Sequence, residues 1–177
     1  MRELCYNRAS CRSDTEWRSV RLKLEDIIDP VPLAYKQHFS KDEFEKIQAG
    51  FHPCDMDDKW FIRFEEPYLW FHRSWTGQSI FRVEITSDAD GFSIKEALCT
   101  NAMLATGGHE HQSDLLEFLI GNLLLGRNLP FPNHNNDDDT HPGLYQHVVS
   151  GTGYPEKGAK PMLTDGASRK RWWQFWR

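Results

Sequence analysis

Residues 57–85, DDKWFIRFEEPYLWFHRSWTGQSIFRVEI, decide the fold of this chain. Apolar and polar side chains alternate in short runs, as in strands with one buried face. Segments rich in Gly, Pro, Asp and Thr interrupt the runs as tight turns. Consecutive strands joined by tight turns favour an antiparallel meander. The four predicted strands are residues 60–65, 68–75, 79–86 and 92–99.

Two helices are predicted beside the meander. The first begins after Ser40, because Ser40 and Glu43 stand at capping-box spacing, and it ends at Gly50. The second runs from Ser113 to Leu125 and is apolar almost all round, so we expect it to be buried against the sheet.

The N-terminal part of the chain adds one strand and one break. Residues 19–24 alternate in the manner of a half-buried strand, and Asp29-Pro30-Val31-Pro32 is expected to interrupt regular structure. We therefore predict an α+β domain over residues 15–132. Residues 133–168 are rich in Gly, Pro, Asn and Asp and are predicted to be mostly irregular, and residues 169–177 form a basic aromatic tail.

Composition limits the classes of function. The chain has 177 residues and a net charge of −5, so it lacks a general attraction for nucleic acid. The four cysteines match neither paired zinc knuckles nor a dense disulfide framework. No apolar run approaches the roughly 20 residues that span a bilayer, and the N-terminus is too polar for a signal peptide. We expect a cytoplasmic protein that needs no cofactor.

The strand at residues 68–75 carries aromatic side chains on both faces. Leu69, Phe71 and Trp75 are predicted to point inward. The outward set lies beside arginines of the two neighbouring strands and suits a ring stacked on a guanidinium that holds a phosphate or carboxylate. A plain cross-strand packing of these rings under the C-terminal segment is the alternative. The predicted ligand-binding residues are Arg63, Tyr68, Trp70, His72, Ser74 and Arg82.

His72 is also the one candidate for catalysis, as a general acid or base. Ser74 lies two residues away on the same strand, about 7 Å apart at Cα, and no nucleophile elbow surrounds it. The spacing does not favour a nucleophilic triad.

His109 and His111 are candidate metal ligands in GGHEHQ, residues 107–112. Two histidines in i, i+2 spacing on a predicted loop are a weak metal signal, so a solvated loop is the favoured interpretation and no metal is predicted. Gly107 and Gly108 are also candidates for a backbone anion nest. Acidic and histidine residues that could complete a metal shell are Glu110, His134, Asp137, Asp139 and His141.

The tail RKRWWQFWR, residues 169–177, places cations next to four large rings. Such a segment can meet a membrane surface, dock on a partner or dock on its own domain. The residues predicted to dock are Arg171, Trp172, Trp173, Phe175 and Trp176.

The block DDKWF followed by LWFHRSWTGQSIFRVEI, with LLEFLIGNLLLG behind it, resembles a family of small uncharacterised bacterial proteins. The resemblance covers residues 55–127 and implies a unit of meander plus helix. It also implies a link to ADP-ribose metabolism, and it assigns no catalytic residues.

Two functions follow from these observations. The favoured one is a small binding module whose aromatic and arginine side chains receive a nucleotide-like or acidic ligand or a protein partner. The alternative is an enzyme that acts on a nucleotide or ADP-ribose derivative, with His72 as acid or base and an arginine that holds phosphate.

Overall fold

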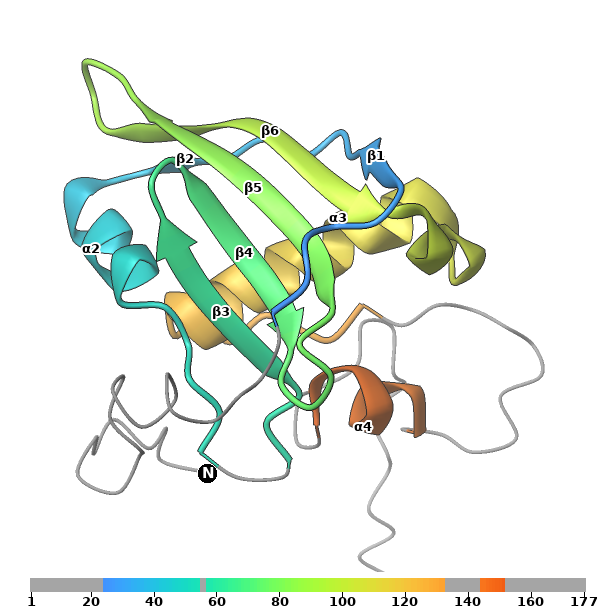
Figure 1. Ribbon diagram of the computed structural model, residues 1–177. Helices are drawn as coiled ribbons and strands as arrows, with labels where there is room; N and C mark the ends of the chain where they lie inside the picture. The colour runs from blue at the N-terminus through green and yellow to red at the C-terminus, as the bar shows by residue number, and fades with distance from the viewer. Residues whose placement is uncertain (1–23, 55–56, 133–143, 152–177) are drawn as a thin grey trace, which may run out of the picture.

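A computed structural model describes residues 24–54, 57–132 and 144–151 (Figure 1). One antiparallel sheet with the strand order β1-β6-β5-β4-β3 carries helices beside it, so the chain is α+β. The elements are β1 (Pro30–Pro32), β2 (His38–Phe39), α2 (Lys41–Ala49), β3 (Trp60–Glu65), β4 (Tyr68–Arg73), β5 (Ser79–Ser87), β6 (Phe92–Thr100), the 3₁₀-helix η1 (Asn101–Ala105), α3 (Gly108–Leu119), the π-helical turn η2 (Ile120–Leu124) and α4 (Leu144–Ser150).

The predicted meander is confirmed, because β3, β4, β5 and β6 pair in sequence order and antiparallel.

The prediction that Asp29-Pro30-Val31-Pro32 breaks regular structure is wrong, because residues 30–32 form the edge strand β1. Its two prolines pair with Thr100 and Leu98 on β6. A proline has no N–H to donate, but an edge strand tolerates it where that position faces away from the ladder. The predicted strand at residues 19–24 lies outside the described residues except for Leu24, which is not in a strand.

The helix α3 crosses one face of the sheet and encloses the core against it (Figure 1). Its apolar side chains pack on the inward side chains of β4 and β5, and the most buried of these residues are Leu69, Phe71, Phe81, Val83, Leu115, Leu116, Phe118 and Leu119. The predicted burial of this helix is therefore confirmed. Its predicted start at Ser113 is wrong, because the helix begins five residues earlier and the Ser113 hydroxyl donates back to the carbonyl of His109.

The helix α2 begins as the capping box predicts. Ser40 Oγ accepts the backbone N–H of Glu43, and the Glu43 carboxylate accepts the N–H of Ser40. These bonds satisfy two of the amides that lack an intrahelical partner at a helix start. Phe44 and Ile47 then point into the core.

A short helix that the sequence did not predict, α4, packs at the lower end of β4 and β3 (Figure 1). The backbone carbonyl of Val149 accepts the indole N–H of Trp60 at 2.7 Å and a guanidinium N–H of Arg73 at 2.9 Å. The Tyr145 hydroxyl lies 2.6 Å from Nε2 of His111 on α3. Side chains of β3, β4 and α3, all distant from α4 in sequence, thus hold this helix in place.

The described helices include none that is both long and apolar enough to cross a membrane. Of the two described cysteines, Cys99 is a buried free thiol, and burial raises its pKa to about 12. The cytoplasmic localisation stays a prediction.

Candidate functional site

Three strands place aromatic and arginine side chains on the sheet face opposite α3. Cross-strand partners point to the same face, and Trp70 pairs with Arg63 on β3 and Arg82 on β5. Leu69 and Phe71 point the other way, into the core. We name this surface the aromatic–arginine face, and its members are Arg63, Tyr68, Trp70, His72 and Arg82.

Arg82 lies between two rings. Its guanidinium carbon is 5.0 Å from the centroid of the Tyr68 ring and 5.6 Å from that of Trp70, within the range of cation–π attraction. In the part of the chain that the structure describes, no oxygen accepts a hydrogen bond from this guanidinium and no carboxylate pairs with it. The rings therefore hold the group in place while its donors stay available.

Trp70 has a buried donor without a partner. Its Nε1–H has no hydrogen-bond partner among the described residues and is covered by neighbouring atoms. A buried donor without an acceptor costs roughly 1–3 kcal/mol, and a ligand on the surface of the face does not reach this one. The Trp70 ring lies flat against that of His72, with centroids 6.0 Å apart and planes 15° apart.

Arg63 is more fully engaged than Arg82. Its guanidinium forms an ion pair with Glu65, lies 5.9 Å from the Trp70 centroid and donates from Nε to Nε2 of His72 at 3.4 Å. Burial lowers the pKa of Arg63 from its ordinary value. The side chain thus orients its neighbours and has fewer donors left for a ligand.

His72 is fully buried, with 0% of its surface exposed. Its Nδ1 lies 3.1 Å from the carbonyl of Gly77, which can only accept, and its Nε2 faces Arg63, which can only donate. The proton is therefore on Nδ1 and the ring is neutral. Burial is the main cause that lowers the pKa of His72 to about 4, and the charge of Arg63 lowers it further.

Residues 24–29 explain this burial. They cross the sheet face at the end where His72 lies (Figure 1), and the N–H of Glu25 donates to the carbonyl of Gly77 at 3.1 Å. Ser79, the cross-strand partner of His72, is 1% exposed. The lower end of the aromatic–arginine face is closed, whereas Tyr68, Trp70 and Arg82 each keep part of their surface exposed.

The structure corrects two placements at the end of β4. Ser74 was expected to face outward on the strand, but it lies in the following turn, is 9% exposed and donates its hydroxyl to the carbonyl of Asp58 at 2.7 Å. Trp75 was expected to point inward, but 58% of its surface is exposed. The strand ends at Arg73 and residues 74–76 form a turn, so the alternation on which both expectations rested does not extend to Ser74 and Trp75.

The prediction that GGHEHQ is a solvated loop is wrong, because His109 and His111 lie in the first turns of α3. Residues i and i+2 of a helix point about 200° apart, so these two histidines do not face one ion. His109 is exposed and His111 is 8% exposed beside Tyr145. Within residues 24–54, 57–132 and 144–151, no three potential ligands gather around a metal position. The candidates His134, Asp137, Asp139 and His141 lie outside the described residues.

Gly107, the N-cap of α3, and Gly108, its first residue, have positive φ angles of 77° and 71°. A Cβ at Gly107 would lie 2.6 Å from Cβ of His111, so this position needs glycine for the helix to begin. The glycine pair therefore has a structural explanation.

A polar cluster around Arg73 was not predicted from the sequence. This guanidinium lies 4.7 Å from the centroid of the Trp60 ring, and burial lowers the pKa of Arg73. Burial also raises the pKa of the Tyr145 hydroxyl to about 12. The alternation on β4 shows that Arg73 shares the core side of the sheet with Phe71, a signal that could have identified it. Its bonds hold α4.

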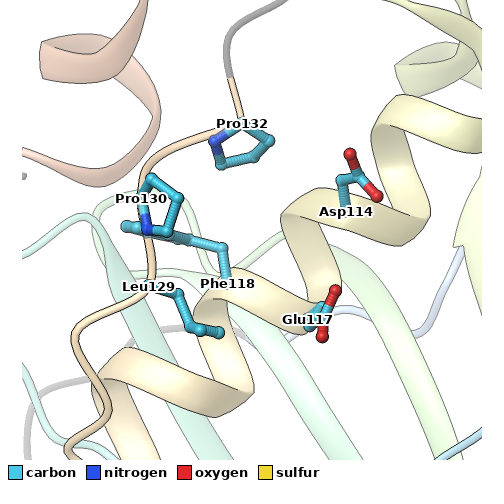
Figure 2. A pocket seen from close by; sticks show the side chains of 6 residues that line it. All are labelled: Asp114, Glu117, Phe118, Leu129, Pro130 and Pro132. Carbon is cyan, nitrogen blue, oxygen red and sulfur yellow. The ribbon is translucent and has the colours of Figure 1, made fainter. Parts of the chain in front are cut away.

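A shallow hollow lies elsewhere, between α3 and the segment that follows η2 (Figure 2). Its volume is about 180 Å³, and its lining residues are Asp114, Glu117, Phe118, Leu129, Pro130 and Pro132. It is on the α3 side of the sheet and so is separate from the aromatic–arginine face. The predicted docking tail, Arg171, Trp172, Trp173, Phe175 and Trp176, lies outside the described residues.

Comparison with protein-family models, with curated proteins and with solved structures finds no match for this chain. The resemblance to small bacterial proteins and the link to ADP-ribose metabolism therefore stay predictions.

Proposed function

We propose that the chain is a small binding module and that its aromatic–arginine face receives an acidic group, presented by a nucleotide-like small molecule or by a protein partner. One observation carries the proposal. The Arg82 guanidinium is held between the Tyr68 and Trp70 rings and pairs with no acidic side chain among the described residues. Planar guanidinium donors match the two oxygens of a carboxylate or phosphate.

The Trp70 ring supports the same proposal. Its centroid lies 5.9 Å from the guanidinium carbon of Arg63 and 5.6 Å from that of Arg82. An acidic group bound at Arg82 would lie next to an aromatic surface that can stack a base or contact an apolar side chain.

The enzymatic alternative has less support. A general base needs an accessible lone pair and a pKa near the working pH. His72 is fully buried, both of its ring nitrogens are engaged, and its pKa is lowered to about 4. The hollow with known lining residues lies over α3 and not over His72.

A thermal-shift screen of the full chain tests the proposal, with ADP-ribose, NAD, ATP and an acidic peptide as probes. A ligand at ten times its dissociation constant stabilises by about 1.4 kcal/mol, which raises the melting temperature of a chain of this size by about 3–6 °C. We expect such a shift for at least one probe. Arg82→Gln should abolish it, and Arg82→Lys should weaken it because the planar fork is lost.

Lys46→Gln is the matched control, because it removes one positive charge from an exposed position on α2. It should leave the shift unchanged. The proposal fails if none of the probes shifts the melting temperature, or if Arg82→Gln responds to them as the wild type does.

A further inference from the structure

The hollow beside α3 combines an apolar floor with an acidic rim. Phe118 and Leu129 form the floor with two prolines, and the carboxylates of Asp114 and Glu117 lie along the helix side (Figure 2). Pockets that bind small molecules measure roughly 300–1,000 Å³. At about 180 Å³ this hollow is too small for a nucleotide and suits a single large side chain.

We propose that the occupant is an aromatic ring of the chain's own C-terminal segment, Arg169–Arg177, and that Asp114 and Glu117 contact the cations next to that ring. The segment lies outside the described residues. Its sequence, RKRWWQFWR, places large aromatic rings next to cations, the two kinds of group that the hollow can accept.

Charge favours this occupant. The segment carries four positive charges and no acidic residue, in a chain whose net charge is −5. Glu117 is exposed and pairs with no cation in residues 24–54, 57–132 or 144–151. Asp114 precedes it by three positions, so the two carboxylates lie on neighbouring turns of one helix face.

The linker is long enough. Tyr145 on α4 contacts Phe131 with ring centroids 5.7 Å apart, and Phe131 lies between the two prolines that line the hollow. The start of α4 therefore lies close to the hollow, and the described chain ends six residues after Tyr145, at Gly151. The 17 residues 152–168 can span at most about 60 Å when fully extended. A covalent connection of this length raises the local concentration of the segment at the hollow.

The aromatic–arginine face is a poor alternative dock for the same segment. Arg63 and Arg82 place two cations on it, and like charges brought together oppose binding. The acidic hollow and the basic face thus select different ligands.

Methyl NMR of the full chain tests the proposal. A docked ring shifts the Leu129 methyl signals through its ring current, whereas Leu98, on the opposite side of the sheet, is the internal control. Replacing Trp172, Trp173 and Trp176 with alanine should move the Leu129 signals and leave those of Leu98 in place. Unchanged Leu129 signals would overturn the proposal.

Charge reversal tests the acidic rim. Glu117→Lys should release the segment and move the Leu129 signals to their positions in the triple-alanine chain. Glu45→Lys makes the same change at an exposed position on α2 and should not. If Glu117→Lys and Glu45→Lys moved the Leu129 signals equally, the carboxylate of Glu117 would not hold the segment, and the proposal would be overturned.

Vesicles separate this occupant from a lipid surface. With phosphatidylcholine vesicles that contain 30% phosphatidylserine, the intact chain should bind about fivefold or more weakly than a synthetic RKRWWQFWR peptide, because a docked segment is available only when it is released. Equal affinities would show that the domain does not hold the segment, and the proposal would fail.

Discussion

Replacing His72 with glutamine should remove a pH-dependent loss of stability. The ring is fully buried and neutral, and burial lowers its pKa from 6.5 to about 4. As the pH falls below 6.5, His72 of the unfolded chain becomes protonated. In the folded chain it stays neutral until the pH approaches 4. The unfolded state then binds more protons, so the free energy of unfolding falls as the pH falls.

The magnitude follows from the two pKa values. Between pH 7.5 and 4.5, His72 should lower the free energy of unfolding by about 2–3 kcal/mol, with a slope of about 1.2 kcal/mol per pH unit in the middle of the range. Glutamine does not titrate, and its amide can still donate to the carbonyl of Gly77 and accept from Arg63. His72→Gln should therefore lose this component and keep the contributions of all other groups.

Urea denaturation at pH 7.5, 5.5 and 4.5 measures the effect as the difference between wild type and variant at each pH. His109→Gln, at an exposed position on α3, is the control and should keep the wild-type dependence. If His72→Gln loses stability toward pH 4.5 as steeply as the wild type, the inferred burial of a neutral ring is wrong. An NMR titration of His72 with a midpoint near pH 6.5 would also contradict the burial of a neutral ring.

Three further substitutions test the packing. Trp60→Phe removes the indole hydrogen bond to α4 and should cost about 1–3 kcal/mol in urea denaturation, with faster proteolysis near α4. Ser40→Ala removes the cap of α2 and should cost about 1 kcal/mol, and a cost near zero would show that the capping box contributes nothing. Gly107→Ala should destabilise more than Gly108→Ala, since both have positive φ but only a Cβ at Gly107 meets a side chain, at 2.6 Å. Equal melting temperatures would refute this steric explanation.

Local patterns predicted the meander and α2 because their determinants are local. Alternating side chains and tight turns specify β3 to β6, and Ser40 with Glu43 specifies the start of α2. The start of α3 could not be found in the same way. Ser113 resembles a cap, and the polar His111 and Gln112 are buried through contacts with distant residues.

The candidate site was predictable only in part. Alternation places Tyr68, Trp70 and Arg82 on one face, and the cross-strand register agrees. The burial of His72 depends on residues 24–29, which reach it across the sheet, and no local pattern contains that contact. The helix α4 has too few residues to be stable by itself and is fixed by hydrogen bonds from β3 and β4.

The pairing of β1 with β6 has a consequence for the order of folding. The strands β3 to β6 follow one another through short turns, whereas Pro32 of β1 pairs with Leu98 across most of the described chain. Contacts between residues far apart in sequence require a long loop to close and form more slowly than local ones. We expect the meander to assemble first and β1 to join a sheet that already exists. The strand that comes first among the described residues is then among the last to fold, so weakening its pairing should speed unfolding and leave the folding rate almost unchanged.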